Sequence, residues 1–345
     1  MNRSLALLGV ATLALAGCQN KANQGDAARD QIRVVGSSTV YPYTTAVAEA
    51  FARKTPGTKA PIVESTGTGA GMKLFCAGVG ARFPDVADAS RRIKPSEYAD
   101  CVKNGVKDIV EIQIGIDGIT LAQSKAGPAL NLSEADVYKA LAANPFGKPQ
   151  TAKTWKDVNP ALPAIAIQVY GPPPTSGTRD AFADLMLTKG CETDPATKAI
   201  ADEAHKKDVC TKLREDGAYV ESGENDNLIV QKLAANPDAV GIFGFSFLEE
   251  NGATLRGVPI QGITPTYESI AGYTYPGARP LFIYVKSAHL NAIPGLKAFV
   301  AEYAGAWGPD GYLKRRGLVV APEDVRQANV AIATNLTPLD PASIK

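Results

Sequence analysis

Histidine is scarce in this sequence, and its scarcity argues against several kinds of catalysis. Only His205 and His289 occur among 345 residues. A Ser-His-Asp hydrolase needs a histidine base beside its nucleophile, and neither histidine lies near a serine-rich loop in the sequence. The chain also has no G-x-S-x-G nucleophile elbow, no G-x-x-x-x-G-K-S/T phosphate loop and no cluster of carboxylates and histidines for a metal-dependent phosphatase. We therefore do not expect an enzyme or a metal cofactor.

An excess of charge of either sign is also absent. The chain has 36 basic and 35 acidic residues, for a formal net charge of +1. Proteins that bind nucleic acid or lie on a membrane surface usually carry a basic patch, and no segment here interleaves basic with aromatic residues. We expect no nucleic-acid partner, so any anion that the protein binds must be held by a local site.

The sequence has no apolar run that could span a bilayer, which takes about 20 residues. The run from Leu5 to Leu15 is shorter, follows Arg3 and leads into Leu15-Ala-Gly-Cys18. This arrangement resembles a bacterial lipoprotein signal. The resemblance implies a lipidated Cys18, a flexible polar tether over residues 19–31, and a periplasmic or cell-envelope protein that meets the membrane through its lipid alone. Outer-membrane or surface placement stays open, and a plain secreted protein is the alternative.

Cysteine is sparse and even in number once Cys18 is set aside. The four others are Cys76, Cys101, Cys191 and Cys210. An even set in an exported chain indicates disulfides formed in an oxidising compartment. Three pairings are open, and we favour Cys76–Cys101 and Cys191–Cys210 because each closes a short loop between neighbouring elements. Zinc is the competing use, but the C-x-x-C spacing that usually supplies zinc ligands does not occur.

Short β-rich runs alternate along the chain with amphipathic stretches, which predicts an α/β fold large enough for two cored domains. Strands are expected at 32–35, 62–64, 86–88, 109–114, 119–122 and 165–170, and helices at 42–54, from 72 onward, and at 96–104, 133–143 and 180–187. Asp117-Gly118 marks a break or a crossing. Ser133 begins a Ser-x-x-Asp helix start. The repeated order of strand, Gly/Ser loop and helix is typical of a parallel sheet with ligands at the carboxyl ends of its strands.

Four loops rich in Gly, Ser and Thr each precede an expected helix. They are Gly36-Ser-Ser-Thr39, Thr66-Gly-Thr-Gly-Ala-Gly71, Ala89-Ser-Arg-Arg92 and Thr175-Ser-Gly-Thr-Arg179. A helix start offers unpaired amides and the positive end of the helix dipole, and hydroxyl side chains add donors. Two of the loops also carry an arginine, which suits an oxyanion. Together the loops predict an anion site, although any one of them could be a simple helix cap.

Six motifs, in this order, resemble the periplasmic phosphate-binding proteins of ATP-driven phosphate importers. They are Gly36-Ser-Ser-Thr-Val-Tyr-Pro42, Thr66-Gly-Thr-Gly-Ala-Gly71, Asp88-Ala-Ser-Arg91, Ser176-Gly-Thr-Arg-Asp-Ala-Phe182, Glu224-Asn-Asp-Asn227 and Arg279-Pro-Leu-Phe-Ile-Tyr284. The resemblance implies a type II periplasmic-binding-protein fold, in which two α/β lobes, each a mostly parallel sheet flanked by helices, are joined by two strands and close on phosphate. One lobe would hold 31–118 plus 280–345 and the other 119–279. It also implies a monomer that delivers phosphate to an importer permease and needs no cofactor.

The same resemblance assigns the ligands. The first lobe would donate from Ser38, Thr39, Thr68, Gly69 and Ser90, and the opposite lobe from Ser176, Gly177 and Thr178. The chain departs from well-known members in one place, since Arg91 stands where they carry an aspartate that accepts the anion's proton. We hypothesise that Arg91 and Arg179 are the cationic ligands and that Asp88 supplies the missing acceptor.

Other interpretations stay open from the sequence. The same fold could serve as a receptor or sensor for arsenate, sulfate or tungstate, or as a surface adhesin. A phosphate-ester hydrolase is the rival from another class. Asp226 and Asn227 are more simply explained as a helix cap or a hinge contact than as ligands.

Overall fold

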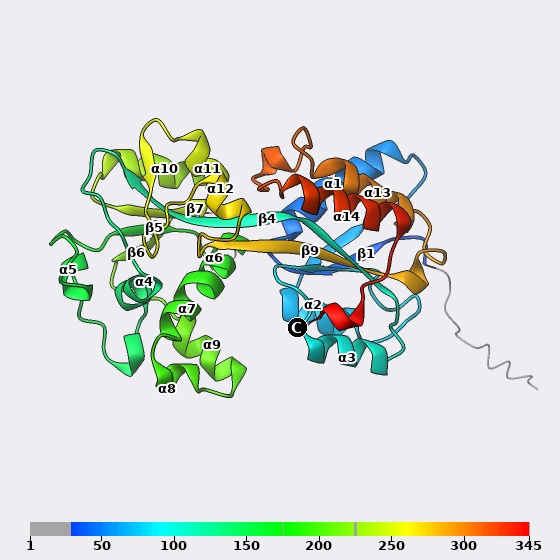
Figure 1. Ribbon diagram of the computed structural model, residues 1–345, viewed down its shortest axis with the longest axis horizontal. Coiled ribbons are helices and arrows are strands. Elements are labelled where there is room, and N and C mark those ends of the chain that lie inside the picture. Colours follow the sequence, from blue (N-terminus) through cyan, green and yellow to red (C-terminus); the bar gives the residue numbers. More distant parts are fainter. Residues whose placement is uncertain (1–28, 175, 224–225, 345) are drawn as a thin grey trace, which may run out of the picture.

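The computed structural model describes residues 29–174, 176–223 and 226–344. It consists of two lobes side by side, connected by the long strands β4 (Ile109–Ser124) and β9 (Ala278–Lys286) (Figure 1). The signal segment, Cys18 and most of the expected tether lie outside the described residues. No helix in the described ranges is both long and apolar enough to cross a membrane.

The first lobe, on the right of Figure 1, is built from both ends of the chain. Its other strands are β1 (Arg33–Gly36), β2 (Ile62–Ser65) and β3 (Val86–Ala89). Its helices are α1 (Tyr41–Lys54), α2 (Thr68–Phe75), α3 (Pro95–Lys103), α13 (Leu296–Ala306) and α14 (Glu323–Asn335), with short turns η3 (Ser287–His289), η4 (Lys314–Arg316) and η5 (Pro341–Ser343).

The second lobe, on the left, is formed by the middle of the chain. Its other strands are β5 (Val169–Gly171), β6 (Tyr219–Glu221), β7 (Val240–Gly244) and β8 (Leu255–Gly257). Its helices are α4 (Glu134–Leu141), η1 (Pro145–Gly147), α5 (Trp155–Val158), α6 (Gly177–Phe182), the π-helix η2 (Ala183–Leu187), α7 (Thr188–Cys191), α8 (Pro195–Lys198), α9 (Glu203–Thr211), α10 (Asp226–Ala235), α11 (Phe245–Glu250) and α12 (Tyr267–Ala271).

One mixed sheet runs through both lobes. Its strand order is β2-β1-β3-β9-β4-β7-β5-β6, with β8 paired to β4. Within each lobe three strands are parallel, namely β1 with β2 and β3, and β5 with β6 and β7. The connecting strands β4 and β9 run antiparallel to their neighbours. The expected α/β fold with two crossing strands is therefore confirmed. The residue boundaries expected for the lobes stay a prediction, because β4 and β9 contribute to both.

Of the two alternatives expected at Asp117-Gly118, the crossing is confirmed and the break is wrong, because β4 passes there from pairing with β9 to pairing with β7. β4 continues without interruption from Ile109 to Ser124, and Asp117 pairs with Arg279 of β9. The irregularity lies earlier, between Gln113 and Gly115, where the register shifts. A Cβ on Gly115 would lie 2.6 Å from the Leu318 side chain, so the C-terminal segment packs directly against this bend.

Two helices begin earlier than expected, and one strand is shorter. α2 starts at Thr68 rather than Met72, because Gly67 takes a φ of +80° and turns the chain directly into the helix. α6 likewise starts at Gly177, and the helix continues through η2 into α7. The run 165–170 joins the sheet only from Val169, because its first residues pair with 153–155 instead. The Ser133 cap is confirmed, with Ser133 Oγ accepting from the Asp136 amide.

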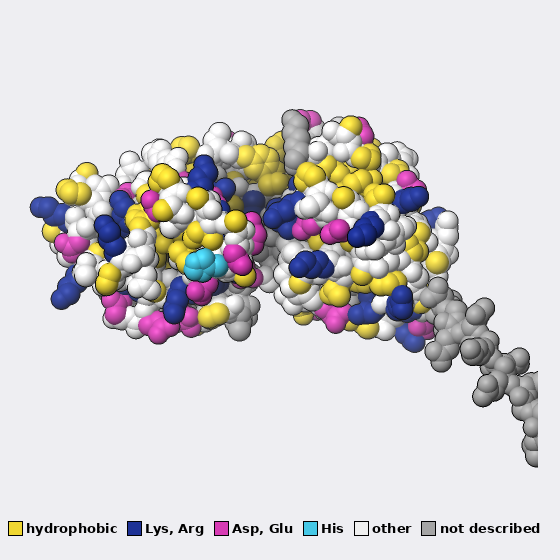
Figure 2. Space-filling view, turned by 90° about the horizontal axis from the view of Figure 1, so that it is seen from below, with side chains coloured by type: hydrophobic (Ala, Val, Ile, Leu, Met, Phe, Trp, Pro, Cys, Tyr) yellow, Lys and Arg dark blue, Asp and Glu magenta, His cyan; other side chains and the backbone are white. Residues whose placement is uncertain are grey.

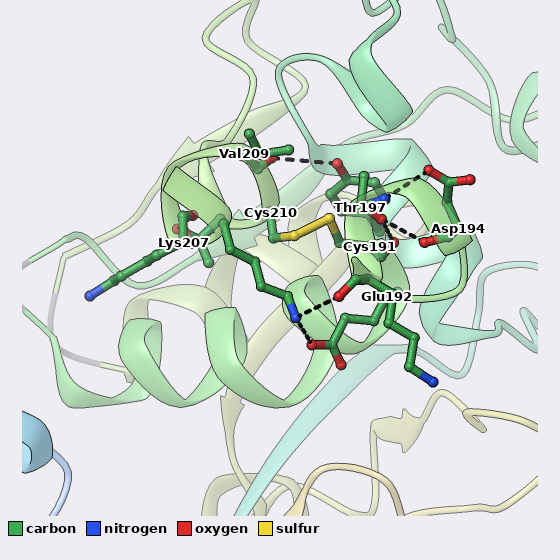
Figure 3. Close-up of a disulfide and its surroundings, with 12 residues drawn as sticks. Cys191, Glu192, Asp194, Thr197, Lys207, Val209 and Cys210 are labelled. Carbon is green, nitrogen blue, oxygen red and sulfur yellow. Dashed lines mark hydrogen bonds and ion pairs between the residues drawn. A yellow bond between two sulfur atoms is a disulfide. The ribbon is translucent and has the colours of Figure 1, made fainter. Parts of the chain in front are cut away.

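Both favoured disulfides are present, one in each lobe. Cys76 is bonded to Cys101, and Cys191 to Cys210. Figure 3 shows the second bond joining α7 to α9, with Thr197 and Asp194 beside it. The Thr197 hydroxyl donates to the Cys191 carbonyl, and the Thr197 amide donates to Asp194 at 3.2 Å. The disulfides occupy the cysteines that the zinc alternative required.

Each lobe has its own hydrophobic core. The second-lobe core includes Trp155, Tyr138 and Phe182, all fully buried. The first lobe has one cluster under α1 and α13, centred on Phe51 and Phe299, and another around the Cys76–Cys101 bond. Separate cores joined by shared strands allow the lobes to move relative to each other.

Candidate functional site

The two lobes meet at a contact between two of the Gly/Ser loops. Thr39 Oγ1 of the first lobe donates to the Gly177 carbonyl of the second at 3.2 Å. A Cβ on Gly177 would lie only 2.6 Å from the Ser38 carbonyl oxygen, so no larger residue fits without movement. Loops 138 residues apart in the sequence therefore form one of the points at which the lobes touch.

A cavity lies on each side of this contact. Cavity A, about 840 Å³, is lined from the first lobe by Ser37–Thr39, Thr66–Ala70, Ser90–Arg92 and Lys94, from the second by Asp180, Ala183–Leu185, Thr188, Lys189, Glu192 and Lys207, and from β9 by Arg279 and Pro280. Cavity B, about 500 Å³, is lined by Ser176–Thr178, Asp117, Asp226 and Arg316 among others, and shares Ser38 and Thr39 with cavity A. Figure 2 shows the groove between the lobes from the side of α3, α7 and α9, with Lys and Arg beside it on the right-hand lobe and Asp and Glu on the left-hand lobe.

The first-lobe donors converge on cavity A. Thr68 Oγ1 lies 3.0 Å from Ser90 Oγ and accepts from the Ser90 amide at 3.1 Å, which joins the second and third loops. The amides of Thr68 and Gly69, in the first turn of α2, donate to no described residue, and neither do those of Ser38 and Thr39. Partnerless amides beside hydroxyl groups form a site for an anion.

The second-lobe donors line the neighbouring cavity B. Ser176 caps α6 by accepting from the Thr178 amide at 3.2 Å. Ser176, Gly177 and Thr178 line cavity B, while the first-lobe ligands and Arg91 line cavity A. The structure therefore brings the two predicted ligand sets together only at Ser38 and Thr39, where the cavities adjoin.

Arg91 lines cavity A, but its charge is already paired. Its Nη1 and Nη2 donate to Glu97 at 2.9 and 2.7 Å. The Arg91 side chain is 35% exposed and Glu97 is 16% exposed, so one edge of the guanidinium remains open to the cavity. The inverted charge at this position is thus offset within the same lobe.

Arg179 points away from both cavities. Its Nη1 donates to the Pro172 carbonyl and to the Tyr219 hydroxyl, each at 3.1 Å, and its guanidinium lies over the Tyr219 ring. The hypothesis that Arg179 is a direct cationic ligand is not supported by this placement. The reason is geometric: Arg179 lies three residues after the Ser176 cap, on the side of α6 that faces β5 and β6.

Arg279 is the buried cation that the sequence argument missed. It lies on β9, with its side chain 8% exposed, and donates to Asp117 at 3.2 Å, to Asp184 at 3.3 Å and to Thr39 Oγ1 at 2.8 Å. It therefore contacts the first lobe, the second lobe and the connecting strand β4 at once. Burial raises the pKa of Asp117, and Arg279 acts in the opposite direction. Arg279 was visible in the sequence as the first residue of the Arg279-Pro-Leu motif. That motif was used only to support the family resemblance, and Arg279 was given no role in the site.

Asp88 lines neither cavity. It is 1% exposed under α1, where it accepts from Thr44 Oγ1 at 2.8 Å. Burial raises its pKa to about 8, against the smaller effect of the Thr44 bond. The hypothesis that Asp88 is the missing acceptor is not supported, because its position on the buried strand β3 directs the carboxyl into the first-lobe core.

Asp226 and Asn227 begin α10, as a helix-start role would require. Asp226 also lines cavity B, and burial raises its pKa to about 6, with the Gly244 amide acting in the opposite direction. Glu224 and Asn225 of the same motif, and Thr175, lie outside the described residues.

The histidines are poorly placed for hydrolysis. His289 is 2% exposed in the first lobe, where Nδ1 contacts Asp85 at 2.6 Å and Nε2 accepts from the Gly80 amide at 3.0 Å. Both ring nitrogens are therefore engaged away from the cavities. His205 is exposed on α9 and lines neither cavity.

Comparison with known proteins places this fold and site in a class. Residues 21–306 match the PBP superfamily domain, so the chain belongs to that superfamily. It is 31% identical over 311 residues to the protein SphX of Synechococcus elongatus, covering 88% of this chain and 81% of the relative. It is 30% identical over 325 residues to the phosphate-binding protein PstS of Staphylococcus aureus strain MRSA252, covering 92% and 85%.

A solved structure agrees with these relatives. The crystal structure of a possible phosphate binding protein from Planctomyces limnophilus matches with a TM-score of 0.70 and 31% identity, covering 88% of this chain and 98% of that one. The chain therefore belongs to the PstS-like family within the PBP superfamily.

Proposed function

We propose that this protein binds inorganic phosphate between its lobes and delivers it to an ATP-driven importer. The observation that carries the proposal is cavity A, in which partnerless amides, two coupled hydroxyls and a buried arginine converge from separate parts of the chain. A desolvated oxyanion gains from such donors because charge-assisted hydrogen bonds are about twice as strong as neutral ones. The names of the relatives support phosphate as the anion.

The ligands we propose come from both lobes. Ser38, Thr39, Thr68, Gly69 and Ser90 donate from the first lobe, and Ser176, Gly177 and Thr178 from the second. Phosphate would lie beside the contact between Ser38 and Gly177, where the two sets meet. Binding then favours the arrangement in which the lobes approach, so closure is coupled to occupancy.

The positive charge comes from Arg279 and Arg91. Arg279 reaches the Thr39 hydroxyl directly, and Arg91 lies at the cavity wall. Arg179 takes a supporting role: by bonding the Pro172 carbonyl it holds the segment that leads into the Ser176 loop.

The setting we propose is outside the cytoplasm. The two disulfides support an oxidising compartment, and the lipoprotein-like start supports an anchor at Cys18. The protein would act as a lipid-anchored monomer that presents its closed lobes to an importer permease, with no cofactor. We also propose lobe boundaries near 118 and 280, and the crossing of β4 and β9 supports them.

Calorimetric titration tests the proposal. The mature chain, stripped of anion by partial unfolding and refolded, is titrated with phosphate, arsenate, sulfate and tungstate at neutral pH. We expect micromolar or tighter phosphate binding, at least tenfold weaker in Ser90→Ala and unchanged in Ser96→Ala, an exposed serine on α3. Preference for sulfate or tungstate would replace phosphate with another oxyanion, and binding of none of the four would overturn the proposal.

A further inference from the structure

Asp180 is an exposed carboxylate that lines the donor-rich cavity. It lies on α6 of the second lobe, and its Oδ2 accepts from Ser38 Oγ of the first lobe. Both residues line cavity A. A negative side chain among anion-binding donors is unfavourable unless the bound anion offers it a proton, because like charges in contact repel.

The other acidic side chains of cavity A are already neutralised. Asp184 pairs with Arg279 at 3.3 Å, and Glu192 pairs with Lys206 at 2.7 Å. Asp180 has no ion-pair partner among the described residues. Its second carboxylate oxygen likewise accepts from no described side chain, so Asp180 keeps lone pairs available inside the cavity.

We propose that Asp180 is the specificity-determining residue that selects oxyanions carrying a proton, an inference that rests on the proposed phosphate-binding function. At neutral pH phosphate and arsenate retain at least one hydroxyl, whereas sulfate and tungstate are fully deprotonated. A protonated anion can donate to Asp180. A deprotonated anion can only place an oxygen against the carboxylate.

The Ser38–Asp180 hydrogen bond shows how an anion fits between them. The Ser38 hydroxyl has one proton, which it now donates to Asp180. When phosphate enters, Ser38 donates that proton to a phosphate oxygen, and the P–OH group donates to Asp180. Both side chains then keep a partner. With sulfate, Ser38 can turn to the anion, but Asp180 then loses its one side-chain donor among the described residues and faces an oxygen instead.

The two lobes thereby divide the work of recognition. Donors of both lobes bind any small oxyanion, and Asp180 of the second lobe rejects the unprotonated ones as a single repulsive group. Specificity of this kind comes from an unfavourable contact with the wrong ligand as much as from a favourable contact with the right one.

Asp180→Asn tests the proposal, because it removes the charge while keeping an acceptor for Ser38. Affinities for phosphate, arsenate, sulfate and tungstate are measured by calorimetry in the wild type and the variant. We expect the wild type to prefer phosphate over sulfate at least a hundredfold, and Asp180→Asn to reduce that ratio at least tenfold by weakening phosphate and strengthening sulfate. The affinity for arsenate should change in the same direction as that for phosphate, and the affinity for tungstate in the same direction as that for sulfate.

Two further variants separate selection from structure. Asp180→Glu keeps the charge and should retain the preference for protonated anions, whatever its effect on phosphate affinity. Asp238→Asn removes an equal charge from an exposed loop of the same lobe and should leave the ratio unchanged. Thermal unfolding of each variant confirms that it is folded.

The outcomes distinguish this inference from the function on which it rests. Phosphate binding with an unchanged phosphate-to-sulfate ratio in Asp180→Asn overturns the role of Asp180 alone and leaves the receptor function standing. Equal weakening of all four anions shows that Asp180 only latches the lobes, and also overturns the inference. Absence of anion binding by the wild type overturns both.

Discussion

In cavity A the first lobe presents hydroxyl groups, arginines and amides that have no partner among the described residues, whereas the second lobe presents three carboxylates together with Lys189 and Lys207. The first-lobe arginines Arg91 and Arg92 are each held by a glutamate of their own lobe, Glu97 and Glu111. The second-lobe Asp184 is held by Arg279, which lies on a strand that both lobes share. The contrast teaches that the site is not a uniform positive pocket. The carboxylates gather on the second lobe, the arginines on the first, and Arg279 lies between them.

Removing Arg279 should have the largest effect, because this one side chain contacts both lobes and the strand β4 that connects them. Arg279→Met leaves Asp117 buried without its cation, and breaking a buried pair costs about 3–5 kcal/mol. We expect that loss in the free energy of unfolding in urea, together with phosphate affinity at least a hundredfold weaker by calorimetry.

Arg315→Met is the matched control for Arg279, since Arg315 is exposed and pairs with no described acidic residue. Arg315→Met should change neither the free energy of unfolding nor the phosphate affinity. Unchanged phosphate affinity in Arg279→Met would remove Arg279 from the site.

Removing each disulfide in turn tests whether the two lobes unfold together or separately. They close loops of 25 and 19 residues, so their loss should destabilise the protein by similar amounts, roughly 3 kcal/mol each. Because β4 and β9 run through both lobes, we expect Cys76→Ala/Cys101→Ala and Cys191→Ala/Cys210→Ala to unfold in one transition each, followed by circular dichroism. Two separate transitions, with only one of them shifted in each variant, would show that the lobes fold independently.

One carboxyl in each lobe, buried Asp88 and half-buried Asp226, predicts a different pH dependence of stability. Burial raises the pKa of Asp88 to about 8 and that of Asp226 to about 6, so each binds its proton more tightly in the folded state. Their contribution to stability is therefore fully present below the ordinary carboxyl pKa of about 4. It is lost as the pH rises, by up to about 1.4 kcal/mol per pH unit, through pH 8 for Asp88 and through pH 6 for Asp226.

Asp88→Asn should therefore flatten the decline in unfolding free energy between pH 4 and 8, and Asp226→Asn only the part below pH 6. Urea unfolding across this range measures both. If the unfolding free energy of Asp88→Asn still declines from pH 6 to 8, the decline comes from a group other than Asp88.

Gly177→Ala tests the contact between the lobes and has the smallest expected effect on stability. The added Cβ would meet the Ser38 carbonyl, so the loops must separate. We expect phosphate affinity at least tenfold weaker with little change in unfolding free energy. Gly305→Ala is the control, because a Cβ there meets nothing within 4 Å and α13 gains up to about 1 kcal/mol of stability. Wild-type affinity in Gly177→Ala would show that closure does not need this contact.

Much of the local structure could be predicted from the sequence. The strand-loop-helix order placed β1, β2 and β3 within a residue or two, and the Ser133 cap was visible as Ser-x-x-Asp. These features depend on neighbouring residues, which the sequence lists in order. At Asp117-Gly118 the sequence predicted a break or a crossing. The crossing is present, and the break is absent because pairing with Arg279 and its neighbours on β9 keeps the strand extended there.

The candidate site was predicted only in part. The Gly/Ser loops are present and meet, but the arginine with the most contacts in the cleft is Arg279, not Arg179. A loop motif says which groups are available and says little about the direction in which a long side chain points. That direction follows from packing, here from Tyr219 for Arg179 and from Asp117 for Arg279.

The sequence by itself determined the α/β class and the loops that offer amides and hydroxyls, and it favoured the local pairing of cysteines, because each depends on periodicity or on short separations along the chain. Only the tertiary structure decided which charges face one another. The pairing of Asp117 with Arg279 spans 162 residues, and the contact of Ser38 with Asp180 spans 142. Contacts across such separations are set by strand register and lobe packing, and register is a property of the whole sheet.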